Sequence, residues 1–314
     1  MSETLVVALG GNAITRSGEI GTIPQQFEHT ADTLRHLAPL FHGDARIAIT
    51  HGNGPQIGNI LIRVEEGERR VPRLPLDTCV SDSQGGMGYM IQRLACELFR
   101  REGIARTAVT VITQVLVDEF DPDLRDPSKP IGAWYSADEA ARAATEKPHW
   151  ILREIEPGRF RRVVCSPKPL RIVEEAAIAR LLEAGMVVIA CGGGGIPVTW
   201  EGDCLVGVEG VIDKDLASSL LARDLGAHKL IIVTSVERAA VKFAHPGQRW
   251  LDTISVAEAR DYLARGEFPP GSMGPKIEAA IAFVEGGGQE CIITSTEHVA
   301  RAVRGETGTH IVAS

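Results

Sequence analysis

The stretch LVVALGGN (residues 5–12) decides the fold, because an apolar run of strand length ends there in a glycine pair. A short run without polar alternation is typical of a strand buried on both faces of a parallel sheet. The pattern returns in RIAITHGNGPQ (46–56) and MVVIACGGGGIP (186–197). A tight turn could explain any one glycine cluster. Three clusters at strand ends favour one ligand crevice, since open parallel sheets bind ligands beyond the carboxyl ends of their strands.

Apolar strand-like runs alternate with segments of helical periodicity along most of the chain. The strands are predicted at 5–9, 46–50, 108–116, 186–190, 229–234 and 290–294. Helices are predicted in EEAAIARLLEAG, KDLASSLLARDLG and SVAEARDYLARG, with Gly185, Gly226 and Gly266 as stops and Ser255 with Glu258 as a capping box. This alternation predicts a mainly parallel sheet between helices.

The alternation breaks between residues 119 and 170, where DPDLRDPSKPIGAW is rich in proline. SADEAARAATE then predicts a short helix capped by Ser136 and Glu139, and WILREIEPGRFRRVV predicts a hairpin that turns at Pro157 and Gly158. We expect a small inserted subdomain in which Trp134 and Trp150 are packing residues. A long ordered loop is the alternative.

Composition narrows the class of protein. The chain has 314 residues and a formal charge of −8, which argues against non-specific binding to nucleic acid. The six cysteines are scattered without a CxxC pair, so neither a zinc site nor a disulfide framework is expected. The start MSETLVVALGG lacks the basic region of a signal peptide, and no apolar run is long enough to cross a bilayer. We therefore expect a cytoplasmic protein without a membrane partner.

Two common phosphate-binding motifs are absent. A Walker A loop requires GxxxxGK[ST], but in GSMGPKIE Pro275 separates the glycine from Lys276 and Ile277 follows the lysine. A Rossmann fingerprint requires GxGxxG, and counting from Gly192 places Pro197 at the third glycine.

Three lysines have proline, glycine or aspartate beside them: Lys129 in DPSKPIG, Lys214 in VIDKD and Lys276 in GSMGPK. A helix start favours anions, so Lys214 is out of place there unless it serves another purpose. The shared chemical use of such lysines would be to neutralise a transferring phosphoryl group, although three solvated surface lysines are the alternative. Asp213 is expected to cap the helix, and Asp215 to pair with lysines.

With these motifs in order, the sequence resembles the carbamate kinases of the amino-acid-kinase superfamily nearly end to end. The resemblance is carried by VVALGGNA, HGNGPQIGN, PLDTCV, TQVLVD, DPSKPIG, SPKP, CGGGGIPV, VIDKDLAS and PGSMGPKIEAAI.

The resemblance implies an α/β fold with an open, mostly parallel sheet in a three-layer αβα sandwich and a small protruding subdomain. Residues 1–210, including the subdomain at 119–170, would bind carbamate or carbamoyl phosphate, and residues 211–314 the nucleotide. It also implies a homodimer that uses ATP/ADP with Mg²⁺ held mainly by the nucleotide phosphates. The reaction would be ATP + carbamate = ADP + carbamoyl phosphate, run toward ATP in catabolism, with arginine, agmatine and purine breakdown as possible sources of carbamoyl phosphate.

The resemblance also assigns roles to residues. The catalytic set would be Lys129, Lys214, Asp215 and Lys276, with Asp215 orienting the lysines rather than acting as a base. The substrate would contact Gly10, Gly11, Asn12, Gly52, Asn53 and Gly54. The nucleotide would contact Gly193, Gly194, Lys214, Phe243, Met273 and Lys276. No residue is expected to be a dedicated metal ligand, and His51 could either touch ligand or pack beneath the loops.

One stretch departs from the family pattern. Carbamate kinases usually carry an Asn-aromatic-Gly-Lys-Pro run beside the nucleotide base, whereas residues 242–246 here read KFAHP. This leaves base preference open and is the sole support for a non-catalytic carbamoyl-phosphate-binding protein. A kinase of the same fold that acts on another small carboxylate is a second alternative, against which PLDTCV and SPKP argue.

Overall fold

An eight-stranded sheet that draws strands from both halves of the chain forms the centre of the structure. The computed structural model describes residues 2–16, 18–148, 150–269 and 271–314, without the side chains of Asn12 and Ala133. In sheet order the strands are β15 (Thr253–Ser255), β17 (Thr309–Val312), β16 (Glu290–Ser295), β12 (Lys229–Thr234), β1 (Thr4–Leu9), β2 (Arg46–His51), β9 (Val187–Ile189) and β3 (Ala108–Thr110). Neighbouring strands run parallel except β16 and β17. The predicted mainly parallel sheet is confirmed.

Helices cover both faces of this sheet, because its strands are apolar on both sides. Along β1, Leu5, Val7 and Leu9 join one buried cluster, while Val6 and Ala8 join the other. The first cluster includes side chains of α1 (Ile23–His42), α3 (Leu76–Glu102) and α9 (Val299–Val303), and the second those of α5 (Glu175–Glu183), α6 (Lys214–Asp224), α7 (Val256–Ala264) and α8 (Met273–Glu285). The three-layer αβα sandwich is therefore confirmed.

The predicted helix ends and capping boxes are confirmed. Helices α5, α6 and α7 end within two residues of the glycines predicted to stop them. The capping box of α7 is formed, since the backbone N–H of Ser255 donates to Glu258 at 2.9 Å. The same arrangement begins α4 (Ala137–Glu146), where the N–H of Ser136 donates to Glu139 at 2.8 Å.

The single strand predicted at 108–116 is wrong, because the chain leaves the central sheet halfway along it. β3 ends at Thr110, and β4 (Gln114–Val117) joins a second sheet in the order β11 (Cys204–Gly207), β10 (Ile196–Glu201), β4, β8 (Pro169–Ile172). The buried side chain of Gln84 holds the crossing point: its oxygen accepts from Thr113 N at 2.8 Å and its nitrogen donates to Thr113 O at 3.1 Å. The hydrophobic periodicity of the sequence cannot predict this contact, because it joins residues 29 positions apart.

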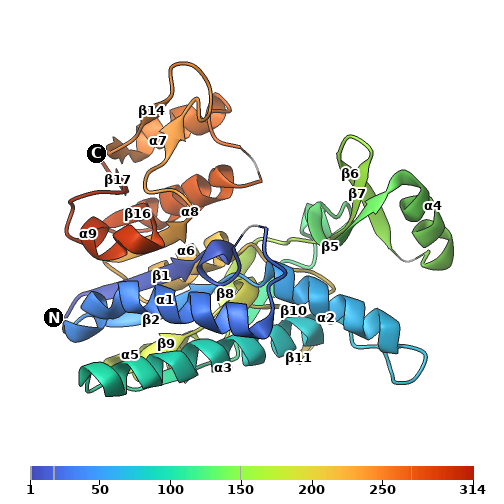
Figure 1. The fold of residues 1–314 in the computed structure, drawn as a ribbon, viewed down its shortest axis with the longest axis horizontal. Coiled ribbons are helices and arrows are strands. Elements are labelled where there is room, and N and C mark those ends of the chain that lie inside the picture. Colours follow the sequence, from blue (N-terminus) through green and yellow to red (C-terminus); the bar gives the residue numbers. More distant parts are fainter. Residues whose placement is uncertain (1, 17, 149, 270) are drawn as a thin grey trace.

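A small three-stranded sheet stands away from the body of the molecule (Figure 1). It contains β5 (Lys129–Ser136), β7 (Arg159–Val164) and β6 (Ile151–Glu156), and α4 packs on it. The predicted hairpin is present, since β6 and β7 are antiparallel and turn at Pro157 and Gly158. Helix α2 (Gly54–Gly67) lies at the base of this sheet.

No helix in the described part of the chain combines the length and the apolar character needed to cross a membrane.

Candidate active site

The three glycine loops meet at one edge of the central sheet, because β1, β2 and β9 are neighbours and run in the same direction. Close approach explains two of the glycines. A Cβ at Gly10 would lie 2.6 Å from the carbonyl oxygen of Val233, at the end of β12. A Cβ at Gly193, whose φ is +66°, would collide with the side chain of Asn53. Larger residues at either position would push the strand ends apart.

Two cavities open at this edge and touch each other. The first, of about 540 Å³, lies toward β12 and α8, and Phe243, Met273 and Lys276 line it. The second, of about 920 Å³, lies between the glycine loops and the small sheet, and Lys129 and Lys214 line it. Gly11, Asp213 and Asp215 line both. Two ligands could therefore meet at these three residues.

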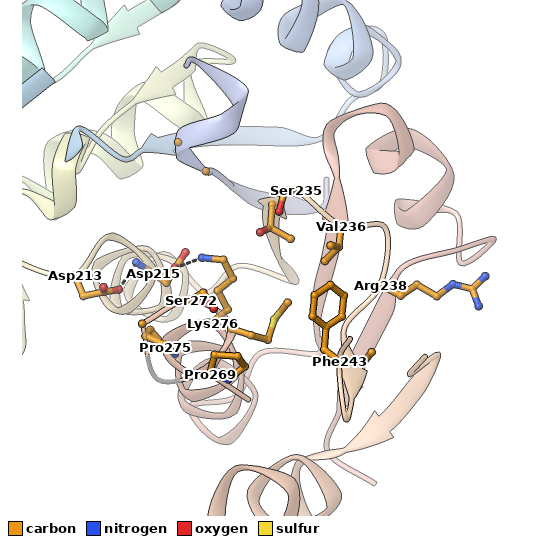
Figure 2. A pocket seen from close by; sticks show the side chains of 16 residues that line it. Asp213, Asp215, Ser235, Val236, Arg238, Phe243, Pro269, Ser272, Pro275 and Lys276 are labelled. Atoms are coloured by element: carbon orange, nitrogen blue, oxygen red, sulfur yellow. Dashed lines mark hydrogen bonds and ion pairs between the residues drawn. The ribbon is translucent and has the colours of Figure 1, made fainter. Parts of the chain in front are cut away.

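The start of α6 supplies the charged groups at the meeting point. Asp213 caps the helix, as predicted, by accepting from the backbone N–H groups of Asp215 at 2.9 Å and Leu216 at 3.4 Å. Asp215 in turn lies between two lysines. Lys214 Nζ is 2.7 Å from its Oδ1, and Lys276 Nζ donates to its Oδ2 at 2.8 Å, a contact drawn in Figure 2. The predicted ion pairing of Asp215 is present, and its part in catalysis stays a prediction.

Burial of these side chains makes their pKa values depend strongly on the neighbouring charges. The side chains of Lys214, Lys276 and Asp215 are 11%, 16% and 6% exposed. Burial raises the pKa of the Asp215 carboxyl, but Lys214 and Lys276 outweigh it and bring the pKa down to about 2. Burial lowers the pKa of the Lys214 ammonium below its ordinary value, and the charge of Lys276 lowers it further.

The ammonium of Lys214 keeps part of its donor capacity free. It pairs with Asp215 at 2.7 Å, an ammonium has three donors, and Nζ has no other hydrogen-bond partner among the described residues. A buried donor without an acceptor is costly, so this geometry is suited to an anion that supplies the acceptor.

Lys129 reaches the same place from the protruding sheet. It begins β5, and its Nζ donates to the carbonyl oxygen of Ile212 at 3.2 Å and lies 3.4 Å from Asp213 Oδ2. Asp213 therefore pairs with a lysine as well as capping α6, a second contact that sequence reasoning missed. Three lysines and two aspartates converge here, which leaves one net positive charge for an anionic ligand.

The remaining predicted residues divide between the cavities. Gly52, Asn53 and Gly54 line the second cavity, as does Gly193, which had been grouped with the nucleotide residues. Gly194 is on neither lining and packs against Ile212. The side chain of Asn12 lies outside the described part of the chain.

His51 packs beneath the glycine loops. It is buried against Gly192 and is absent from the linings of the two cavities. Burial lowers the pKa of its imidazole to about 4, so the ring is neutral at pH 7.

Several cavity residues were not predicted. Thr234, Ser235 and Val236 line the first cavity at the carboxyl end of β12, where the rule that placed the glycine loops could have found them. Figure 2 shows Ser235 and Val236 across this cavity from Lys276, with Arg238 pointing away. Trp134 also lines the second cavity, which goes beyond the packing role expected for it.

The altered stretch at 242–246 forms a tight loop between β13 (Ala240–Val241) and β14 (Arg249–Trp250). Lys242 and Ala244 both have positive φ, +51° and +62°, a region that costs a residue with a Cβ about 1 kcal/mol. Phe243 lines the first cavity and meets Trp250 edge to face, with ring centroids 6.2 Å apart. The loop thus keeps an aromatic wall despite its changed sequence.

The donor set fits a metal that arrives with its ligand. Among the described residues no cluster of three or more His, Cys, Asp or Glu side chains could hold an ion alone. Mg²⁺ in phosphoryl-transfer sites is usually bound by substrate phosphates and one or two carboxylates, and Asp213 and Asp215 are carboxylates that line both cavities.

Comparisons with known proteins agree with this architecture. The model of the amino acid kinase family matches residues 3–295. A carbamate kinase-like protein of Escherichia coli (strain K12) is 45% identical, and a carbamate kinase of Pyrococcus horikoshii 42% identical, each alignment covering 99% of both chains. The solved structure of carbamate kinase from Giardia lamblia bound to AMP-PNP is 37% identical, with a TM-score of 0.93 over 99% of this chain and 98% of that chain.

The low pKa of Asp215 predicts an acid-sensitive contribution to stability. The folded-state pKa of about 2 lies below the ordinary value of 3.8, so this contribution is complete above about pH 4 and is lost as the pH falls toward 2. We expect the unfolding free energy of the wild type to fall by about 2 kcal/mol more than that of Asp215→Asn between about pH 5 and pH 2, in urea titrations. The exposed Asp261→Asn should keep the wild-type pH dependence. Equal acid dependence in Asp215→Asn and the wild type would contradict the assignment.

The positive φ of Ala244 predicts that glycine is better at this position. Ala244→Gly should raise the free energy of unfolding by about 0.5–1 kcal/mol, because the loop then carries less backbone strain. The matched change Ala141→Gly, in the exposed face of α4, should lower it by about 1 kcal/mol. Denaturant unfolding measures both, and a destabilised Ala244→Gly would rule out strain in this loop.

Proposed function

The chain belongs to the amino acid kinase family, and we propose that it is a carbamate kinase, an ATP-dependent phosphotransferase that interconverts ATP and carbamate with ADP and carbamoyl phosphate. The Pyrococcus horikoshii relative named above carries this activity in its name, and the Escherichia coli relative is named carbamate kinase-like, each over nearly the full length of the chain. The predicted resemblance and fold agree with them.

One observation in the site carries the proposal: Asp215 holds one lysine from each cavity where the cavities meet. Lys276 lines the first cavity, Lys214 lines the second, and the two ammonium groups lie on opposite oxygens of the same carboxylate. A phosphoryl group that passes from a nucleotide in the first cavity to carbamate in the second would cross this point.

The chemistry requires charge neutralisation and alignment more than proton transfer. In the ATP-forming direction a β-phosphate oxygen of ADP forms the new bond to phosphorus, the bond between phosphorus and the carbamate oxygen breaks, and carbamate leaves as an anion. No proton has to move, so no general base is needed. The lysines offset the repulsion between two anions, and the free donors of Lys214 would bind the transferring oxygens.

Each group has a proposed place in this reaction. Phe243 and Met273 would lie against the nucleotide, with Lys276 on its phosphates. Gly52, Asn53 and Gly54 would face carbamate with Gly193, and Lys129 would cover it from the protruding sheet. Gly10, Gly11 and Asn12 would lie near the transferring group. Residues 1–210 would thus form the carbamate lobe and residues 211–314 the nucleotide lobe. Gly194 would support the loop from below.

We further propose that Mg²⁺ binds through the nucleotide phosphates, where it would spread their negative charge, with Asp213 and Asp215 nearby. We also propose a cytoplasmic homodimer that runs toward ATP in catabolism, with arginine breakdown as one source of carbamoyl phosphate.

The deciding experiment is an ATP-forming assay with purified protein, ADP, Mg²⁺ and carbamoyl phosphate. ATP should appear in proportion to the protein added. Folded protein that makes no ATP under these conditions would refute the proposal. Tight ligand binding by calorimetry without turnover would then favour a non-catalytic binder, and faster turnover of another acyl phosphate would favour a kinase of different specificity.

Lys214 is predicted to serve activity and not stability. Lys214→Ala should lower ATP-forming turnover by about 10²–10³. Its free energy of unfolding should stay within about 1 kcal/mol of the wild-type value, because burial disfavours the charged lysine and Asp215 keeps its pair with Lys276. Coupled-enzyme kinetics and urea unfolding measure the two effects.

The matched control is Arg101→Ala, an exposed cation in the last turn of α3 that is on neither cavity lining, and it should keep its activity. Near-normal turnover in Lys214→Ala would remove Lys214 from the mechanism.

A further inference from the structure

Helix α2 connects the substrate side of the site to the protruding sheet. It begins at Gly54, directly after the loop of Gly52 and Asn53, and it ends at Gly67. Midway, the backbone of Gly58 lies so close to β5 that a Cβ there would be 3.2 Å from Cα of Gly132. Helix α2 therefore borders the second cavity and also packs against β5 of the small sheet.

The contact between α2 and the small sheet is apolar near the cavity. Ile57 and Leu61 of α2 belong to the same buried cluster as Ile131 of β5 and Val164 of β7. Apolar contacts of this kind hold the two surfaces together without requiring particular partner atoms, because they are not directional. A directional contact adds to the restraint on the position of the sheet.

Glu65, in the last turn of α2, makes that directional contact. Its Oε1 lies 3.5 Å from Nη1 of Arg162 in β7, and its Oε2 lies 3.3 Å from Nζ of Lys147 at the end of α4. The Glu65 and Arg162 side chains are 17% and 10% exposed. The mostly buried carboxylate of Glu65 thus forms ion pairs with two separate elements of the protruding subdomain.

An aromatic ring completes the cluster. Lys147 Nζ lies 4.1 Å from the centroid of the Trp150 ring, and Arg162 Cζ lies 5.0 Å from it. Both cations therefore contact the indole ring as well as the Glu65 carboxylate, and such cation–π contacts add to the ion pairs. Burial lowers the pKa of the Arg162 guanidinium, and Glu65 is the largest of the neighbouring charges that oppose this shift.

The register of the small sheet carries this restraint to Lys129. Arg162 lies opposite Ile131 in the β5–β7 pair, and Lys129 lies opposite Val164 in the same pair. Lys129 is therefore two residues along β5 from the position that faces Arg162. Its ammonium reaches Asp213 at 3.4 Å across the second cavity.

We propose that Glu65 is a positioning residue for phosphoryl transfer, which anchors the protruding subdomain to α2 so that Lys129 stays over the carbamoyl-phosphate side of the site. The inference rests on the proposed function for its kinetic test. Glu65 lies at the far end of α2 and is absent from the linings of the two reaction cavities, so it acts through Lys129 and not on the substrate.

The test variant is Glu65→Gln, which keeps the side-chain shape but turns an amide toward two cations. We expect the KM for carbamoyl phosphate to rise, and kcat to fall, by about tenfold to a hundredfold, because a misplaced Lys129 no longer aligns the substrate. The KM for ADP should stay at the wild-type value, since the nucleotide cavity contains no residue of the protruding sheet. The neighbouring exposed Glu66→Gln is the matched control and should behave as the wild type. Parallel rises in both KM values would indicate general damage to the fold and overturn the inference.

A double-mutant cycle separates action through Lys129 from action elsewhere. In a Lys129→Ala background, Glu65→Gln should have little further effect on kcat/KM for carbamoyl phosphate. Multiplicative losses in the double variant would show that Glu65 acts independently of Lys129.

Hydrogen exchange keeps the structural claim testable even if the wild type makes no ATP. Glu65→Gln should speed amide exchange in β5, β7 and α4, while Glu66→Gln should leave it unchanged. Unchanged exchange in Glu65→Gln would show that Glu65 does not anchor the protruding subdomain, whether or not the protein is a carbamate kinase. Faster exchange in a protein that makes no ATP would leave the anchoring role intact and refute only the proposed function.

Discussion

Asp215 holds the ammonium groups of Lys214 and Lys276 on its two carboxylate oxygens, at 2.7 and 2.8 Å. Three buried charges of mixed sign are stable together but costly when separated, since each would lack compensation. The rest of the site is built around this cluster. Asp213 fixes the helix start that carries Lys214 and Asp215, and α8, which packs beside α6, delivers Lys276. The central sheet places both helix starts at the edge where the glycine loops end.

The cluster also explains why a lysine can stand at the start of a helix. A lone lysine would meet the positive end of the helix dipole, but here a carboxylate one residue later offsets it. The offset is incomplete, since burial still depresses the pKa of Lys214, and its ammonium has no partner beyond Asp215 among the described residues that would satisfy its remaining donors. Under the proposed function, an incoming phosphoryl group would supply the acceptor that this buried cation lacks.

Features that depend on neighbouring residues could be predicted from the sequence, and those that depend on distant contacts could not. The capping boxes at Ser136 and Ser255 were predictable because their partners lie three residues away. The split of the strand at 108–116 was not, because it depends on a bond between Gln84 and Thr113, 29 positions apart. In the site, the lysines and glycines were found from their unusual settings. The pairing of Lys129 with Asp213 was missed, as it spans 84 positions and a sheet that only the folded chain brings into place.

The strand order of the central sheet has a consequence for how the chain is made. β1 lies in the middle of the sheet, and its partner on one side is β12, so that Thr4 bonds to His228 across 224 positions. During synthesis the first strand must wait for nearly three quarters of the 314-residue chain before it can complete its pairing with β12. Until then, an apolar strand with an open edge is exposed on the growing chain. The same placement that unites the two cavities on one sheet leaves one edge of β1 unpaired until β12 has been synthesised.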